Sequence, residues 1–265
     1  MTEDVVTLLD AAHRAVSNDP ENETLRLRFF ERLADGEMFL LLEKEAEGET
    51  LDPRVFDLES GPVVLVFDRE ERLAEFTGGV APYAALPGRV IAGLLRGQGI
   101  GLGVNLGGAP SEMILPPEAM DWLAETLDGG PEEAEGLPER FLAPKSLPQS
   151  LLTGLDAKLA RAAGLAGYAL ISAVEWTGGR RGHLLAFVDA EPGSEPALAR
   201  AAHEALVFSG LDAAEMDVVF FRAGELAEAA MAKVALRFDL PLPDQPQIAT
   251  PAAPGMDPNK PPRLS

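Results

Sequence analysis

The segment of this chain whose composition could bind phosphate is GQGIGLGVNLGG, residues 97–108, with six glycines in twelve positions. Glycine-rich loops bind phosphate where they join a strand to the start of a helix, because their backbone N–H groups then point at the anion. The dinucleotide pattern G-x-G-x-x-G would need glycine at Leu106, and a P-loop would need Lys-Ser or Lys-Thr at Ala109 and Pro110. We therefore expect no tight nucleotide binding and no bound cofactor.

Counting residues 99–106 by twos predicts a β-strand instead, since successive side chains point to opposite faces. The two faces would be an apolar one and a bare one: Ile100, Leu102, Val104 and Leu106 against Gly99, Gly101, Gly103 and Asn105. Glycine inside a strand costs roughly 0.5–1 kcal/mol relative to alanine, so we expect the missing side chains to serve a purpose.

Two uses of the bare face are open. One is close packing by a neighbouring element, and the preceding helix is the expected occupant through its apolar residues Val90, Ile91, Leu94 and Leu95. The other is a binding surface, with Gly101, Gly103 and Asn105 as candidate binding residues. Packing predicts that Gly101→Val and Gly103→Val destabilise alike, whereas Ser111→Val, outside the strand, should change little.

Metal and catalytic chemistry find little support in the sequence. The chain has no cysteine, and its three histidines, His13, His183 and His203, stand far apart. The stretch from His203 begins like a zinc-protease helix, but Val207 occupies the place of the second histidine. No G-x-S-x-G motif occurs. We expect no metal site and no catalytic residues.

Composition points to a cytoplasmic protein without nucleic-acid or membrane partners. The net charge is −21, and most of the excess acid lies in residues 1–128. Such a field repels phosphate backbones and anionic lipids. No apolar run approaches the length of about 20 residues that spans a bilayer, and the acidic N-terminus does not resemble a signal peptide.

The expected fold class is α+β, with two small domains whose hairpin-containing sheets are packed by helices. The N-terminal domain should occupy residues 1–128. Its expected elements are helices within residues 3–16 and 17–36, a strand at 37–43, a loop over 43–61, a hairpin with strands VVLVF and LAEFT, a helix starting near Pro87, the glycine-rich strand, a strand MIL and a helix between Pro116 and Gly129.

A linker is expected over residues 129–146, and the C-terminal domain over 147–240. Its expected elements are a helix within 147–164, a long hairpin turning at Gly178 and Gly179, a helix within 194–210, a strand MDVVFF and a final helix GELAEAAMAKVA. The last segment, 241–265, has eight prolines in 25 residues and too few large apolar residues to fold, so it should be disordered.

Two stretches together resemble the N-terminal domain of the SseB family, named for enhanced serine sensitivity in bacteria: VVLVFDREERLAEFTGG and GLGVNLGGAPSEMILPPEAMDWLAETL. Phe76-Thr77 and Asn105-Leu106-Gly107 match the family's pattern, with Leu106 in place of the usual proline. Residues from about 145 to 240 resemble the family's C-terminal domain in the order of their elements. The family has no established catalytic residues, so the resemblance implies none here.

These observations predict a protein that acts by binding and is not an enzyme, most simply an adaptor for a protein partner. The alternative is a small-molecule sensor or regulator linked to amino-acid (serine) metabolism, for which the family name is the warrant. A hydrolase that uses a divalent cation and the surplus carboxylates is a third hypothesis.

Overall fold

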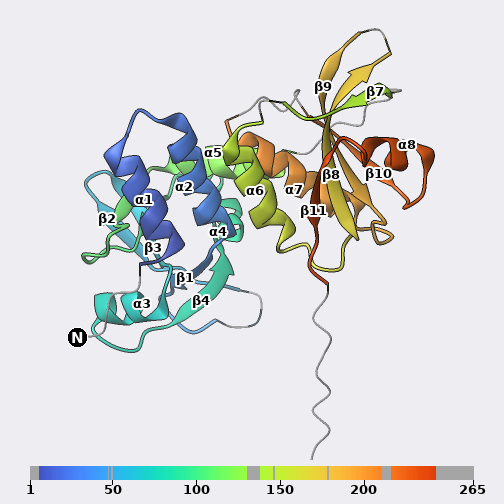
Figure 1. Ribbon diagram of the computed structural model, residues 1–265. Coiled ribbons are helices and arrows are strands. Elements are labelled where there is room, and N and C mark those ends of the chain that lie inside the picture. The colour runs from blue at the N-terminus through green and yellow to red at the C-terminus, as the bar shows by residue number, and fades with distance from the viewer. Residues whose placement is uncertain are drawn as a thin grey trace, which may run out of the picture.

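Two mixed β-sheets, each packed against helices, make up the described part of the chain (Figure 1). The computed structural model describes residues 6–46, 48, 50–129, 138–145, 147–177, 179–210 and 216–242. Its eight helices and two sheets confirm the expected α+β class. Disorder was expected for residues 241–265. Residues 243–265 lie outside the described part of the chain.

The N-terminal half, residues 6–129, holds a sheet in the order β4-β1-β3-β5-β6, with β2 paired to the beginning of β3. Only β3 and β5 run parallel. The strands are β1 Glu37–Leu41, β2 Val55–Leu58, β3 Gly61–Phe67, β4 Tyr83–Pro87, β5 Gly101–Val104 and β6 Met113–Leu115. The helices are α1 Leu8–Asn18, α2 Glu23–Asp35, α3 Glu70–Thr77, α4 Gly88–Leu95 and α5 Pro117–Asp128.

Both faces of this sheet are covered. On one face, α1, α2, α4 and α5 bury a core that includes Leu9, Phe29, Ile91 and Met120. On the other face, α3 contributes Leu73 to a smaller cluster of β1 and β3 side chains. Helix α1 begins with a capping box, in which the Thr7 hydroxyl accepts a hydrogen bond from the Asp10 N–H and the Asp10 carboxylate accepts one from the Thr7 N–H.

The C-terminal half, residues 138–242, holds a sheet in the order β10-β9-β8-β11, with β7 also paired to β8. Helices α6 and α7 cover one face of it, and Met231 of α8 packs on the other. The strands are β7 Pro138–Leu142, β8 Tyr168–Trp176, β9 Arg181–Val188, β10 Met216–Phe221 and β11 Leu236–Asp239. The helices are α6 Gln149–Leu159, α7 Glu195–Val207 and α8 Leu226–Met231.

Several expected elements are corrected by the structure. The segment LAEFT belongs to helix α3 and not to a hairpin strand, and strand β4 precedes the helix that was expected to begin near Pro87. The expected loop over 43–61 contains strand β2, and the expected linker over 129–146 contains strand β7. Strand β11 follows the last helix. Strands β2 and β7 are short, and their sequences VFDL and PERFL lack the alternation by which strands are found in a sequence. Strand β11 does alternate, as LRFD, but it is only four residues long.

The two halves are joined by a shared core residue. Phe208, directly after α7, is only 3% exposed and belongs to the hydrophobic core of the N-terminal half. Helix α5 also packs against α7 at this junction (Figure 1). The two sheets therefore have separate cores, but the C-terminal half completes the core of the N-terminal one.

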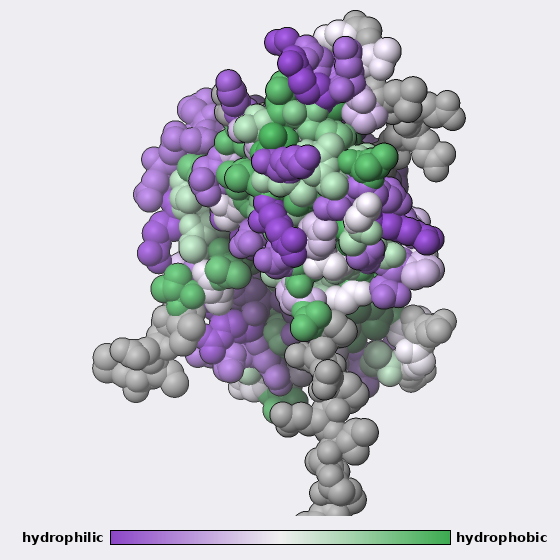
Figure 2. Space-filling view, turned by 45° about the vertical axis from the view of Figure 1, so that its right-hand side comes forward, coloured by the Kyte–Doolittle hydropathy of each residue, from purple (hydrophilic) through white to green (hydrophobic). Residues whose placement is uncertain are grey.

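In Figure 2, polar and charged residues cover much of the visible face, and hydrophobic residues gather mainly in its upper part. No helix in the described ranges combines the length and apolar character needed to cross a membrane.

Candidate functional site

The candidate binding residues Gly101 and Gly103 lie inside the sheet. Both belong to β5, all of whose residues are buried. A Cβ at Gly101 would come within 2.6 Å of the backbone oxygen of Leu115 on β6, and one at Gly103 within 2.5 Å of Cδ2 of Leu65 on β3. The bare face is therefore covered at Gly101 and Gly103. Gly99 is exposed and precedes β5, so it does not belong to the strand.

The prediction that helix α4 packs on the bare face of β5 is wrong. Ile91 and Leu95 of α4 pack with Leu102 and Val104, on the opposite face of β5. Leu106 does not share that face either, because it packs with the cluster beneath α3. The alternation breaks at Asn105, whose φ of 50° is left-handed, a conformation that asparagine tolerates better than most residues.

The third candidate, Asn105, is a structural residue in a buried polar network. Its side-chain amide donates a hydrogen bond to Ser111 Oγ at 2.8 Å and accepts one from the Asp68 N–H at 2.9 Å. Ser111 in turn donates to Asp10 at 2.5 Å, and Arg72 donates to both Asp10 and Asp68. The network joins α1, α3 and the ends of β3 and β5.

Hydrogen bonds and charge keep Asp10 ionised in this network. Burial alone would raise the pKa of Asp10, but the hydrogen bonds from Arg72 and Ser111 outweigh it and hold the pKa well below its usual range. Ser111 is fully buried, so the structure reverses the expectation that Ser111→Val changes little.

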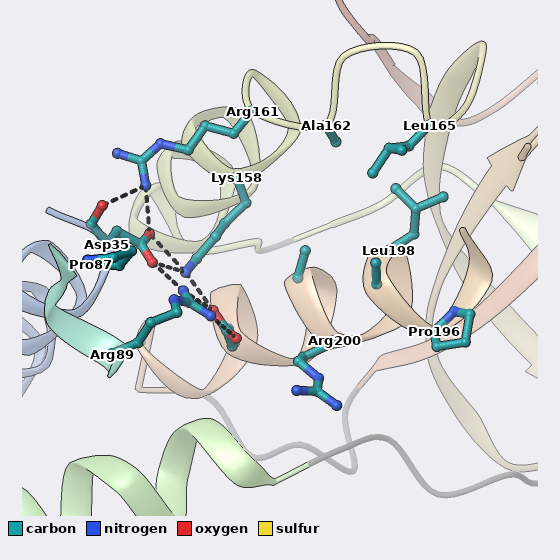
Figure 3. Close-up of a pocket in the computed structure, with 13 residues that line it drawn as sticks. Asp35, Pro87, Arg89, Lys158, Arg161, Ala162, Leu165, Pro196, Leu198 and Arg200 are labelled. Atoms are coloured by element: carbon teal, nitrogen blue, oxygen red, sulfur yellow. Dashed lines mark hydrogen bonds and ion pairs between the residues drawn. The ribbon is translucent and has the colours of Figure 1, made fainter. Parts of the chain in front are cut away.

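A second cluster of charges lies where the two halves meet, and each half contributes one cation and one anion (Figure 3). Three of the side chains are buried, and that of Arg89 is half-buried. Asp35 ends α2 and Arg89 lies on α4, whereas Lys158 lies on α6 and Glu204 on α7. The Lys158 ammonium lies 2.6 Å from Glu204 and 2.8 Å from Asp35. Arg89 donates two hydrogen bonds to Glu204, at 2.9 and 3.0 Å, and one to Asp35. Each carboxylate therefore contacts both cations.

The electrostatics of these four residues favour their charged forms. Burial would raise the pKa values of Asp35 and Glu204, but Lys158 and Arg89 outweigh it and lower both. The hydrogen bond to Glu204, together with its charge, raises the pKa of Arg89. A buried pair of this kind stabilises little on balance, but breaking it by removing one partner is costly, typically about 3–5 kcal/mol.

Beside this cluster, the carboxyl group of Glu31 on α2 is buried, and nearby groups offset the cost of burying its charge only in part. Its Oε1 atom has no hydrogen-bond partner among the described residues, and the side chain is 5% exposed. Burial raises its pKa, and the nearby Lys158 charge opposes this only in part.

An open cleft of about 580 Å³ adjoins the ion pairs. We call it the junction cleft, and its lining residues come from both halves: Asp35, Pro87, Arg89, Lys158, Arg161, Ala162, Leu165, Pro196, Ala197, Leu198, Arg200, Ala201 and Glu204. In Figure 3 the ion-paired residues lie on one side together with Pro87, most of the apolar residues lie on the other, and Arg200 stands apart from the ion pairs. The cleft therefore combines fixed charges with an apolar wall, which is typical of small-molecule sites.

A smaller hollow of about 320 Å³ lies between α2 and α5. We call it the Trp122 groove, and it is lined by Glu23, Arg26, Leu27, Phe30, Ala119 and Trp122. Trp122 is 37% exposed, and its ring meets that of Phe30 edge-on at a centroid distance of 4.9 Å.

Sequence reasoning did not find either site. One signal was available for the junction: Lys158 follows Leu151 and Leu155 at helical spacing, which places a charge on the apolar face of its helix. Glu204 lies in the incomplete zinc motif that begins at His203, and the sequence carries no signal of its pairing across the junction. The histidines remain scattered, and in the part of the chain that is described no three His, Asp or Glu side chains are grouped so that they could hold a metal ion.

The structure thus assembles two surfaces that could bind, the junction cleft and the Trp122 groove, and it buries the residues that the sequence suggested. Comparisons with protein-family models, with curated proteins and with solved structures found no match.

Proposed function

We propose that this chain is a cytoplasmic, non-enzymatic adaptor of the SseB type that binds a protein partner through the Trp122 groove. The observation that carries the proposal is the exposed indole of Trp122, held edge-on against Phe30 at the rim of a hollow. Tryptophan is enriched among the few residues that dominate binding energy at protein interfaces. A partner side chain inserted beside it would bury both rings.

The charge around the groove indicates the chemistry of the partner. Glu23 lines the groove, and the exposed Glu118 precedes Trp122 by one helical turn on the same face of α5. Arg26 is the one cation that lines it. Since the whole chain carries −21, a basic segment with an apolar side chain is the complementary partner, and its association should be accelerated by charge.

The test is affinity capture from the protein's own cell extract with three baits: wild type, Trp122→Ala and Leu226→Ala. Leu226 is 92% exposed on α8 and serves as a control for an exposed apolar side chain outside the groove. We expect a basic protein that wild type and Leu226→Ala retain and that Trp122→Ala loses, with affinity reduced by at least about tenfold, as expected of an interface hot spot. Equal retention by all three baits would refute the groove as the adaptor surface.

A second candidate function, a small-molecule sensor or regulator of amino-acid metabolism, is favoured by the junction cleft. Its volume of about 580 Å³ lies within the range of small-ligand sites, and both halves line it. A ligand bound there would contact both halves and so influence how they pack.

A further inference from the structure

The Trp122 groove combines aromatic rings with charged side chains that have no partner. Glu23 and Arg26 line it beside the rings of Phe30 and Trp122. Glu118 lies one helical turn before Trp122 and, like the two charged lining residues, is exposed. None of these three charged side chains has an ion-pair or hydrogen-bond partner among the described residues. The groove therefore offers an occupant aromatic surface, two carboxylates and one guanidinium.

The chain itself carries a segment of matching chemistry, residues 257–264, which we call the tail segment. It reads DPNKPPRL and contains the motif P-x-x-P, which binds in aromatic-lined grooves as a polyproline II helix. Three residues complete one turn of that helix, so its side chains fall on three edges. Two of these edges would be a charged one and an apolar one: Asp257, Lys260 and Arg263 against Pro258, Pro261 and Leu264.

The charges of the tail segment complement those of the groove. Its two basic side chains suit the two carboxylates, and Asp257 suits the guanidinium of Arg26. Residues 241–265 hold eight prolines but only two basic residues, both in the tail segment, so charge selects this part of the proline-rich sequence. Prolines that pack on Trp122 would leave water, and a polyproline II helix has little conformational freedom left to lose on binding.

Helix α7 begins close to the point where the described chain ends. At its beginning, the hydroxyl of Ser194 donates a hydrogen bond to the main-chain oxygen of Leu165. The N–H of the adjacent Gly164 donates to the oxygen of Pro241, one residue before the described chain ends. The start of α7 is therefore a fixed reference for where residues 243–265 begin.

The other end of α7 lies beside the Trp122 groove. A Cβ at Gly210 would come within 3.7 Å of Cδ1 of Leu27, which lines the groove. Helix α7 has 13 residues and is therefore about 20 Å long. Residues 243–260, which connect the described chain to Lys260, span up to about 60 Å when fully extended. The tail segment has ample length to reach the groove.

We propose that the tail segment binds in the Trp122 groove of its own chain and so occupies the surface that a protein partner needs. A tethered segment of this kind competes at an effective concentration on the order of 1 mM, so a partner must displace it. The inference rests on the groove of the proposed function. Its tests use no partner, so their failure would leave the adaptor function standing.

Acrylamide quenching of tryptophan fluorescence tests the bound state in the full chain. It reports mainly on Trp122, because Trp176, the other tryptophan, is only 8% exposed. The double variant Lys260→Glu/Arg263→Glu should release the tail segment and increase quenching. The control Arg222→Glu/Lys233→Glu makes the same change of charge at exposed residues outside the groove and should quench like wild type. Equal quenching of all three chains would overturn the proposal.

Dilution distinguishes the chain's own tail segment from that of a second copy. A contact within one chain does not depend on protein concentration, so wild-type quenching should stay constant over a wide concentration range. An increase in quenching on dilution would show that the segment comes from another molecule, and would overturn the proposal.

A peptide of residues 255–265, labelled for fluorescence anisotropy, tests the pairing in trans. It should bind the full-length Lys260→Glu/Arg263→Glu chain and bind wild type at least about tenfold more weakly, because the tethered segment competes there. Adding Trp122→Ala to the released chain should weaken peptide binding at least about tenfold, whereas adding Leu226→Ala should not. Thermal melts establish that each variant is folded. Absence of binding to the released chain, or equal affinity for it and for wild type, would overturn the proposal without touching the adaptor function.

Discussion

A single oxygen atom, the Ser111 hydroxyl, links buried polar side chains whose pairing stabilises the fold. The Ser111 hydroxyl donates to Asp10 and accepts from Asn105, so one oxygen satisfies two side chains that belong to different elements. Asn105 in turn accepts from the backbone of Asp68. Removing the Ser111 hydroxyl leaves the Asn105 amide without its acceptor and takes one hydrogen bond from the Asp10 carboxylate, which keeps its contacts with Arg72. An unpaired buried donor costs more than a hydrogen bond contributes.

Ser111→Val should therefore lower the free energy of unfolding by about 1–3 kcal/mol, measured by denaturant melts at neutral pH. Ser17→Val is the control, because the Ser17 hydroxyl is exposed and bonds only to the His13 carbonyl in its own helix. That change should cost a few tenths of a kcal/mol or less. Equal effects of the two substitutions would contradict the role assigned to Ser111.

Some helices and strands of this protein are easier to predict from sequence than others. Helix α5 has proline in its first turn and Gly129 at its end, and the β8–β9 hairpin has long apolar strands around glycines, so both were predicted. Helix α3 was mistaken for a strand because LAEFT is short and contains β-favouring residues. Its left-handed cap at Gly78 and its initial Glu70 and Glu71 are the helix signals.

The covering of strand β5 could not be derived from local pattern at all. Its bare face predicts close packing, and the structure confirms that at Gly101 and Gly103. The contacting groups are Leu115 of β6, Leu65 of β3 and Leu106, and only the sheet order brings the first two alongside. For the same reason the junction cleft was not foreseen. Its residues come from four helices and the segments beside them, and no spacing along the chain relates them.

The two glycines of β5 should respond differently to a side chain, although the sequence predicts equal effects. A Cβ at Gly101 would meet a backbone oxygen of β6, whereas one at Gly103 would meet the ends of the Leu65 and Leu106 side chains. Because a paired strand cannot shift as readily as a side chain, Gly101→Ala should destabilise by about 1–3 kcal/mol and Gly103→Ala by less. Chemical denaturation compares the pair, and a larger loss at Gly103 would show that the Leu65 side chain cannot move aside.

The whole molecule depends on its charges at the junction. Asp35 and Glu204 have lowered pKa values in the folded chain, so they contribute stability above about pH 4, the range of unfolded carboxyl groups. That contribution is lost as the pH falls toward their folded pKa values. Glu31 has a raised pKa and acts in the opposite sense, because the stability it contributes when protonated is lost as the pH rises through its folded pKa.

Glu204→Gln should reduce the free energy of unfolding at pH 7 by roughly 3 kcal/mol, because Arg89 and Lys158 lose a buried counter-charge. Its deficit should shrink as the pH falls below about 4, because Glu204 is then protonated in the unfolded wild type and must lose that proton on folding. Glu31→Gln is the matched variant: it should be more stable than wild type at pH 7, and its advantage should disappear under the same acidic conditions. Denaturant melts over this pH range measure both, and parallel pH profiles for wild type and Glu204→Gln would contradict the charge coupling.

Phe208 also sets an order of events during synthesis. The first half of the chain leaves the ribosome early, and domains generally fold as units in that order. Yet one aromatic ring of its core is encoded far downstream, at the end of α7. Until that ring emerges, the nascent N-terminal half holds an unfilled hydrophobic site, and the residues that will surround Phe208 remain open to chaperones.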